Sequence, residues 1–296
     1  MANGGAWDST SIESHGQGRY TATIDPMWDL AMVPQGGVLA AIAARAMEAE
    51  LGTGQLLRSI HGVFASPVPA GPVEITVDVL RSGRSMSQAQ ATVRAPGAAA
   101  GFTALAAFGH ERPGFAYTEL AFPDVPPPEE CVSFRDPPPP ESGMTERPQF
   151  PFWRDVLEGR PAMGHPPWDP SPRGAAEVAT WFRFDHQPLD EQGGFDQLAL
   201  LVAADMMPSA VFEKVNDVET GWFAPSVDLT VHLCGIPTGT WLLNHNKAHY
   251  AGDGYASAQV ALWDPAGVDG PTLLAYGTQV MFFTSFDFDA PRPQSS

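Results

Sequence analysis

Proline divides this chain unevenly, and that division sets the first limit on its fold. Of the 30 prolines, 15 lie between Pro123 and Pro172, including the run PPPP at 137–140. Proline lacks a backbone N–H and has a fixed φ, so this stretch cannot form the interior of a sheet and favours extended, semi-rigid backbone. We therefore predict four parts: an N-terminal domain over 1–112, a connector over 113–150, a C-terminal domain over 151–287 and a flexible tail over 288–296.

The two halves resemble each other in sequence. Ser59 aligns with Ser226 at an offset of 167 residues, and Leu105 aligns with Leu274 at an offset of 169. An offset that changes by only two residues between these positions indicates an internal duplication. We therefore expect the two halves to share one fold.

Each half begins with a helical pattern and continues as a series of strands. Helices are predicted over 34–50 and 196–211. Strands joined by Gly and Pro turns are predicted over 57–109 and 224–283. One long helix followed by antiparallel strands packs most simply as a sheet curled around the helix, so the fold class is predicted to be α+β.

The composition limits the partners that the protein can have. The formal net charge is −18 in 296 residues, which argues against a nucleic acid or an anionic membrane surface as partner. No apolar run approaches the ~20 residues of a membrane helix, and the first residues lack the basic and apolar regions of a signal peptide. Two cysteines are too few for a disulfide framework. We expect a cytoplasmic protein.

One carboxylate stands on the apolar face of the second predicted helix. Asp196 is the predicted N-cap of this helix, and Leu198, Leu201 and Val202 define its apolar face. Asp205 follows Leu201 by four positions, so it falls on the same face. Burial of an unpaired carboxylate costs several kcal/mol, so Asp205 is a candidate functional residue, with a hydrogen-bonded structural carboxylate as the alternative.

The order of these segments resembles the double-hotdog acyl-CoA thioesterases of the bacterial thioesterase II type. In the first half the resemblance rests on QGGVLAAIAARA and on the strands that follow, including the Arg-x-Gly-Arg-Ser turn. In the second half it rests on LLVAADMMP, PSVDLTVHL and LLAYGTQVMF. The resemblance covers about residues 20–285. It implies a double hotdog of two antiparallel sheets, each wrapped around one long helix.

The resemblance also implies a catalytic set for thioester hydrolysis. Members of the family hold the attacking water with an aspartate, a threonine or serine, and a glutamine. These match Asp205 in Ala-Ala-Asp, Ser226 in Ser-Val-Asp and Gln279 four residues after Ala275. The best-known members carry Thr where this chain has Ser226, but both side chains present a hydroxyl. Arg45 stands in the first half where the second has Asp205, and arginine cannot act as a base, so one site per chain is expected.

Five further residues are candidates for oxyanion stabilisation and substrate binding. The N–H groups of Gly36 and Gly37 open the first helix and suit an oxyanion or a closely approaching ligand. His61 is predicted to lie beside that helix. Arg81 and Arg84 are candidates for the phosphates of coenzyme A, because the rest of the surface is anionic.

Two other functions remain open at this point. A hotdog enoyl-CoA hydratase or dehydratase would use a histidine with an acidic residue, and His61 is the candidate. A non-catalytic acyl-CoA or acyl-carrier binding module would keep the pocket without turnover. No cofactor or metal is expected: on a strand, the imidazoles of His245 and His249 would lie about 13 Å apart, too far for one ion. Acyl-CoA is the expected substrate, and self-association to a homo-oligomer is expected from the resemblance.

Overall fold

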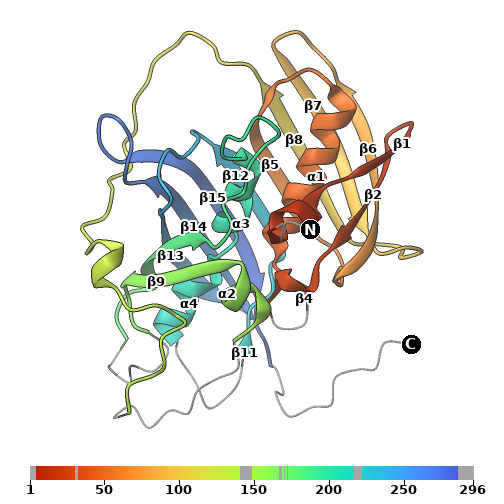
Figure 1. Ribbon diagram of the computed structural model, residues 1–296. Helices are drawn as coiled ribbons and strands as arrows, with labels where there is room; N and C mark the ends of the chain where they lie inside the picture. The colour runs from red at the N-terminus through yellow and green to blue at the C-terminus, as the bar shows by residue number, and fades with distance from the viewer. Residues whose placement is uncertain are drawn as a thin grey trace.

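The fold is built on one continuous antiparallel sheet (Figure 1). The computed structural model describes residues 5–30, 33–140, 149–166, 169, 171, 173–215 and 222–285. The main sheet has twelve strands in the order β1-β2-β6-β7-β8-β5-β12-β15-β14-β13-β10-β9. Two small pairs, β3 with β4 and β11 with β16, lie outside it.

The first half contains one long helix, with four short strands before it and four longer strands after it. Its elements are η1 (Ala6–Thr10), β1 (Glu13–Gly16), β2 (Arg19–Ile24), η2 (Pro26–Trp28), β3 (Asp29–Leu30), β4 (Val33–Pro34), α1 (Gly36–Leu51), β5 (Leu56–Phe64), β6 (Gly71–Arg81), β7 (Met86–Arg94) and β8 (Phe102–Gly109). Alanines and other apolar residues of α1 are almost fully buried against β5–β8. The helix ends at Leu51 and is capped by Gly52, whose φ of 58° is the left-handed conformation that glycine adopts at little cost.

The second half repeats this plan with a shorter, broken helix. Its elements are η3 (Pro128–Glu130), α2 (Pro151–Asp155), β9 (Leu157–Met163), β10 (Glu177–Phe184), η5 (Gln197–Ala199), α3 (Leu200–Ala204), α4 (Pro208–Val215), β11 (Trp222–Phe223), β12 (Asp228–Leu233), β13 (Leu242–Gly252), β14 (Tyr255–Asp264), β15 (Thr272–Phe282) and β16 (Thr284–Ser285). Helix α3 packs against β12, β14 and β15, and it also contacts α1. Both helices therefore share the inner face of the sheet (Figure 1).

The expectation of two separate sheets is wrong. Strands β5 and β12 pair antiparallel from Asp228 opposite Val63 to His232 opposite Ser59, so the two halves form one sheet. Alternation of apolar residues predicts strands but not which edges pair, and pairing the two exposed edges satisfies their backbone N–H and C=O groups.

The expectation of one helix over 196–211 is also wrong in part. The side chain of Asp196 accepts a hydrogen bond from the N–H of Leu198, as an N-cap does. The helical segment ends at Asp205, which has φ −81° and ψ 54°. Helix α4 then starts at Pro208, and a proline disfavours helical backbone in the residue before it.

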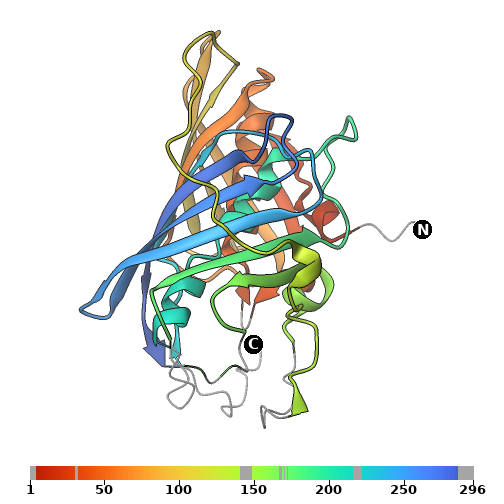
Figure 2. The same ribbon diagram turned by 90° about the vertical axis from the view of Figure 1, so that its left-hand side faces the viewer.

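The proline-rich segment crosses the outer face of the second half (Figures 1 and 2). Residues 110–127 contain no helix or strand. The ring of Phe122 packs against Trp181 and Trp263, and the indole N–H of Trp181 donates to the carbonyl oxygen of Pro126 at 2.9 Å. The segment thus covers apolar side chains that would otherwise be exposed. The four-part division of the chain remains a prediction.

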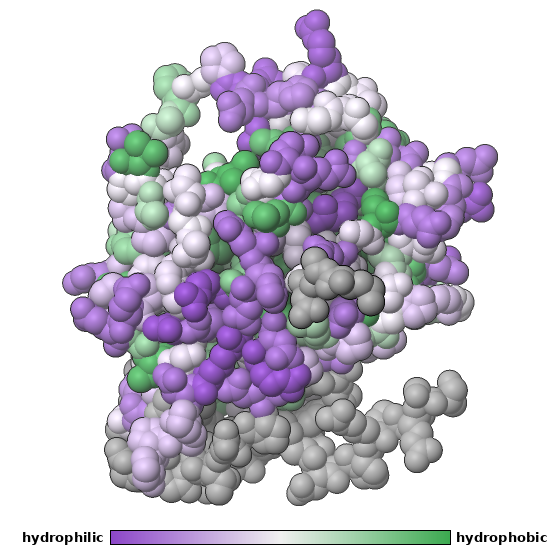
Figure 3. All heavy atoms as spheres, viewed as in Figure 1, coloured by the Kyte–Doolittle hydropathy of each residue, from purple (hydrophilic) through white to green (hydrophobic). Residues whose placement is uncertain are grey.

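Hydrophilic side chains cover most of the face shown in Figure 3, with apolar residues scattered between them. Among the helices of the described residues, none combines the length and apolar character that crossing a bilayer requires.

Candidate active site

The second helical segment ends where the first helix begins, and Asp205 lies at that junction. Asp205 is the C-cap of α3 and is only 8% exposed. The start of α1 approaches closely enough that a Cβ at Gly36 would lie 2.7 Å from Asp205 Oδ2. A Cβ at Gly37 would lie 2.3 Å from the carbonyl oxygen of Leu201. The two glycines are therefore required for the contact between the helices.

Asp205, Ser226 and Gln279 meet in a triangle of polar contacts. Gln279 Nε2 lies 2.5 Å from Asp205 Oδ1 and 2.7 Å from Ser226 Oγ, and it can donate one hydrogen to each. Ser226 Oγ lies 3.4 Å from the same carboxylate oxygen. Gln279 is buried, whereas Ser226 is half-buried. The three residues come from three separate segments of the second half.

A break in strand alternation explains how Ser226 reaches this triangle. Simple alternation would place Ser226 on the same face as Thr230 and His232. Strand β12 begins only at Asp228, and Ser226 instead forms an isolated bridge with Met281. Asp228 Oδ1 accepts a hydrogen bond of 2.7 Å from the N–H of Val280. This contact fixes the segment of Ser226 beside the strand that carries Gln279.

Sequence reasoning missed Gln35, which holds the other side of the carboxylate. Gln35 is the residue before α1 and is 2% exposed. Its Nε2 lies 3.1 Å from Asp205 Oδ2, 3.0 Å from the carbonyl oxygen of Asp205 and 3.1 Å from that of Val202. Its position directly before the two glycines is the only signal in the sequence that could have singled it out.

Burial raises the pKa of Asp205 to about 6. Four hydrogen bonds oppose this rise, because they stabilise the ionised carboxylate. The largest effect is from Gln279, followed by the backbone amide of Gly37, the hydroxyl of Ser226 and the backbone amide of Gly36. A carboxyl group with a pKa of about 6 is largely ionised at neutral pH and can still accept a proton from water, as a general base must.

The structure brings Gly36 and Gly37 to this cluster, but their amides act on the Asp205 carboxylate. Their expected role as donors to an oxyanion stays a prediction.

The other predicted substrate-binding residues lie outside the cluster. His61 is exposed on the outer face of the sheet, where its Nδ1 lies 2.8 Å from Thr230 Oγ1. The expectation that His61 lies beside α1 is wrong, because Ile60 and Gly62 occupy the inward positions of β5. Arg81 at the end of β6 and Arg84 in the following turn are exposed, and neither contacts the Asp205 cluster.

The opposite end of the helix pair carries a related but different contact. Arg45 Nη2 lies 2.8 Å from Asp196 Oδ2, which also accepts from the indole of Trp7 at 3.1 Å. Thus Gln35 before α1 holds Asp205 after α3, while Asp196 before η5 holds Arg45 in α1. The contact of Gln35 with Asp205 joins a neutral amide to a carboxylate, whereas the contact of Asp196 with Arg45 is an ion pair.

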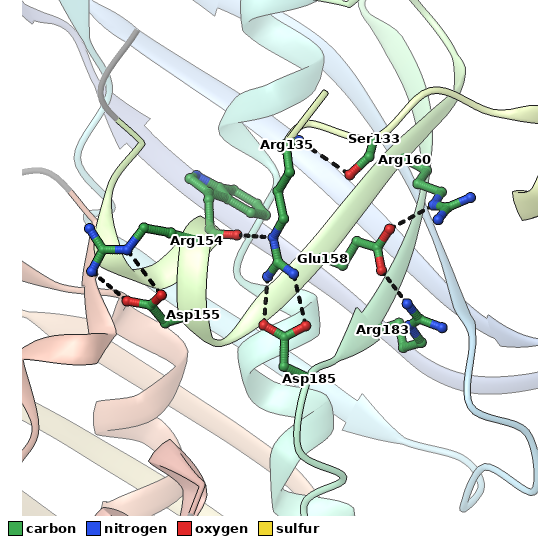
Figure 4. Close-up of polar contacts among 9 residues, drawn as sticks. Ser133, Arg135, Arg154, Asp155, Glu158, Arg160, Arg183 and Asp185 are labelled. Carbon is green, nitrogen blue, oxygen red and sulfur yellow. Dashed lines mark hydrogen bonds and ion pairs between the residues drawn. The ribbon is translucent and has the colours of Figure 1, made fainter. Parts of the chain in front are cut away.

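A third polar cluster lies on the outer strands β9 and β10 (Figure 4). Glu158 pairs with Arg160 at 2.8 Å and with Arg183 at 2.5 Å, and Arg135 forms a two-bond pair with Asp185. A cavity of about 220 Å³ borders this cluster; its lining includes Arg183, Asp185, Phe195 and Thr240. These arginines already have carboxylate partners, and Arg135 belongs to the proline-rich segment, so the cluster fastens that segment to the sheet.

Comparison with known proteins identifies both halves. Residues 24–109 match the acyl-CoA thioesterase N-terminal domain and residues 128–283 match the acyl-CoA thioesterase C-terminal domain. No curated protein sequence matches the chain.

Solved structures share the fold over nearly the whole chain. A hot-dog-fold protein of unknown function from Alicyclobacillus acidocaldarius is 23% identical, with 97% of this chain and 99% of that chain covered and a TM-score of 0.76. The TesB protein of Mycobacterium avium subsp. paratuberculosis is 19% identical, with 94% and 98% covered and a TM-score of 0.72. The acyl-CoA thioesterase II TesB2 of Mycobacterium marinum is 17% identical, with 95% and 98% covered and a TM-score of 0.70.

Proposed function

The chain belongs to the acyl-CoA thioesterase family, and we propose that it hydrolyses acyl-CoA to a free acid and coenzyme A with water activated by Asp205. The observation that carries this proposal is the contact of Asp205 with Ser226 and Gln279 at the start of α1. A buried carboxylate, a hydroxyl and an amide are the groups needed to hold and deprotonate one water molecule.

Each side chain has a separate task in this mechanism. Asp205 accepts a proton from the water as its oxygen attacks the thioester carbon. Ser226 and Gln279 replace their direct contact with hydrogen bonds to that water and fix its direction of attack. Holding the water in attacking geometry can remove roughly 7–11 kcal/mol of the barrier.

The start of α1 stabilises negative charge throughout the reaction. In the resting protein the amides of Gly36 and Gly37 favour ionised Asp205. When Asp205 takes the proton it loses its charge, and a negative charge develops on the thioester oxygen. The amides and the positive end of the helix are then free to stabilise that oxyanion. As the tetrahedral intermediate collapses, the C–S bond breaks and the proton on Asp205 passes to the departing thiolate.

Release of free thiol from a panel of acyl-CoA substrates of different chain length tests the proposal. We expect the purified protein to hydrolyse at least one member with saturation kinetics. Cys234 is exposed, so a thiol reagent must be calibrated against protein without substrate. Tight acyl-CoA binding without turnover would instead support a binding module, and hydration of enoyl-CoA that depends on His61 would support a hydratase.

A further inference from the structure

Two buried asparagines of β13 contact the backbone on either side of Asp205. Asn244 and Asn246 are 0% and 1% exposed. Asn244 Nδ2 lies 2.6 Å from the carbonyl oxygen of Ala203, and Asn246 Nδ2 lies 3.0 Å from that of Met206. A backbone carbonyl must meet the NH₂ group of an amide side chain, because the amide oxygen has no hydrogen to donate. Both contacts therefore have one defined orientation.

These contacts complete the hydrogen bonding of the end of α3. Carbonyl groups in the last turn of a helix have no partner within the helix. Here the N–H of Asp205 donates to the carbonyl of Leu201, and that of Met206 donates to Ala204. The carbonyl of Met206 accepts from both the N–H and the hydroxyl of Ser209. Side-chain amides supply the donors for the other carbonyls and one further donor for Met206. Gln35 donates to the carbonyls of Val202 and Asp205, Asn244 to Ala203, and Asn246 to Met206.

The placement of the asparagines is costly unless they serve this purpose. Their neighbours on β14 in the sheet register are Leu262 and Val260, which are fully buried. Within the described residues, Asn244 Oδ1 and Asn246 Oδ1 are buried without a hydrogen-bond partner. An unpaired buried oxygen costs free energy, so two apolar side chains would suit this inner face better if packing were the only requirement.

We propose that Asn244 and Asn246 are positioning residues, which hold the end of α3 so that the Asp205 carboxylate stays against the start of α1 and beside Ser226 and Gln279. The proposal rests on the proposed function of Asp205 as the base. The two asparagines touch no reacting atom. They act through the carbonyls of Ala203 and Met206, and Asn246 Nδ2 also lies 2.9 Å from Ser209 Oγ.

Among the described residues, few ionisable groups on the elements around α3 lie where they could shift the pKa of Asp205. On α1, Arg45, Glu48 and Glu50 lie toward the far end of the helix, and the N-cap of η5, Asp196, pairs with Arg45. On β12, Asp228 binds the N–H of Val280 and His232 is exposed.

The remaining strands around α3 also contribute few such groups. On β14, Asp264 binds the turn of Thr238 and Gly239, and β15 carries only Tyr276. On β5, Arg58 binds the carbonyl of Gly109 and His61 is exposed.

The test compares three leucine variants. Asn244→Leu and Asn246→Leu each remove the side-chain amide that donates to the end of α3. Gln55→Leu is the matched control. Gln55 is also buried and donates to a backbone carbonyl, that of Gly83, in the first half of the chain. Each variant is examined by thermal melting, by kcat and KM with the best acyl-CoA of the panel, and by a ¹³C NMR titration of the Asp205 carboxyl without substrate, assigned with Asp205→Asn.

We expect both asparagine variants to lower kcat at least tenfold, to leave KM within threefold and to move the midpoint of the Asp205 titration by half a pH unit or more. Gln55→Leu should lower the melting temperature and leave kcat and the titration unchanged. The proposal would be overturned if both asparagine variants kept the wild-type kcat and the wild-type midpoint of the Asp205 titration. It would also be overturned if Gln55→Leu changed both quantities as much as the asparagine variants do. If a leucine variant does not fold, the smaller Asn244→Ser or Asn246→Ser takes its place.

The titration separates this proposal from the proposed function. If the wild-type protein hydrolyses no acyl-CoA while the asparagine variants still shift the Asp205 titration, the function fails and the positioning stands. If hydrolysis is present and the titration does not move, the positioning fails alone.

Discussion

At the scale of single residues, the site depends on how closely two helix ends approach. Asp205 is buried against the first residues of α1, and every polar contact of its carboxylate comes from a neutral group: Gln35, Gln279, Ser226 and the amides of Gly36 and Gly37. Among the residues that the structure describes, no opposite charge contacts this carboxylate, and burial raises the pKa of Asp205 to about 6. A carboxylate kept in this state is poised to exchange a proton.

Gly36→Ala tests the close approach directly. Helix propensity alone predicts a gain of roughly 0.5–1 kcal/mol from alanine. The new Cβ, however, would lie 2.7 Å from both Asp205 Oδ2 and the ring of Phe64, and overpacking typically costs about 1–3 kcal/mol. We expect the clash to dominate, with a lower melting temperature and a kcat reduced at least tenfold.

Gly114→Ala is the control for this substitution, because no heavy atom lies within 4 Å of a Cβ at that position. It should leave melting temperature and kcat unchanged. A Gly36→Ala protein with wild-type stability and activity would show that the two helix ends do not need to be this close.

The sequence contained part of this site but not its framework. Asp205 could be predicted because a carboxylate interrupts an apolar helical face, whereas Ser226 and Gln279 were predicted only from the resemblance to the thioesterases. The burial of Asn244 and Asn246 could not be predicted, because the polar sequence Leu-Asn-His-Asn-Lys is typical of an exposed strand rather than of a strand with buried inward positions. Their role arises from tertiary contact with the end of α3, which no local pattern encodes.

At the scale of elements, the two helices are held together at both ends by different chemistry. At one end Gln35 binds Asp205, and at the other Asp196 binds Arg45. Glu48 follows Arg45 on α1. Burial and, to a smaller extent, the nearby charge of Asp196 raise the pKa of Glu48 to about 7, while Arg45 opposes this rise.

The raised pKa of Glu48 predicts how stability depends on pH. Between its ordinary pKa of 4.5 and about 7, the folded protein binds more protons at this position than the unfolded chain. The free energy of unfolding therefore falls as pH rises from about 4.5 to about 7. Above pH 7 this residue causes no further decrease. Glu48→Gln removes this contribution, so we expect the variant to exceed the wild-type protein by about 1–2 kcal/mol at pH 8.

Thermal melting at pH 5 to 8 measures this difference. The advantage of Glu48→Gln should grow with pH, which corresponds to a few degrees in melting temperature for a chain of this size. Parallel stability curves for the two proteins would show that Glu48 is not protonated preferentially in the folded state.

At the scale of the whole molecule, the duplicated halves are joined through the sheet. The sequence predicted both the repeated order of elements and an α+β fold, since these follow from periodicity and turns. It did not predict one sheet, because the pairing of β5 with β12 depends on two edges meeting in space. The apolar pattern of 196–211 did not predict the break of the second helix at Asp205, which reflects both the proline at 208 and the contacts of this helix end with α1 and β13.

The joined sheet predicts that neither half is stable alone. A fragment of residues 1–112 would expose the edge of β5 and the face of α1 that packs against α3, and an open apolar edge favours aggregation. We expect this fragment to elute as aggregate in size-exclusion chromatography, and coexpression with 113–296 to restore a complex with a single melting transition. A monomeric, cooperatively melting 1–112 fragment would contradict this view of the fold.

The central claim is that Asp205 is the base that activates water. The most direct measurement is the pH dependence of kcat/KM for acyl-CoA hydrolysis by the wild-type protein and by Asp205→Asn. We predict that wild-type kcat/KM falls about tenfold per pH unit below a midpoint near 6, the pKa of Asp205. A folded Asp205→Asn protein should lose at least about a hundredfold in kcat/KM, within the usual range for a general base, and should lack this acidic limb. Wild-type rates with the same acidic limb in Asp205→Asn would contradict the claim and move the base to another residue.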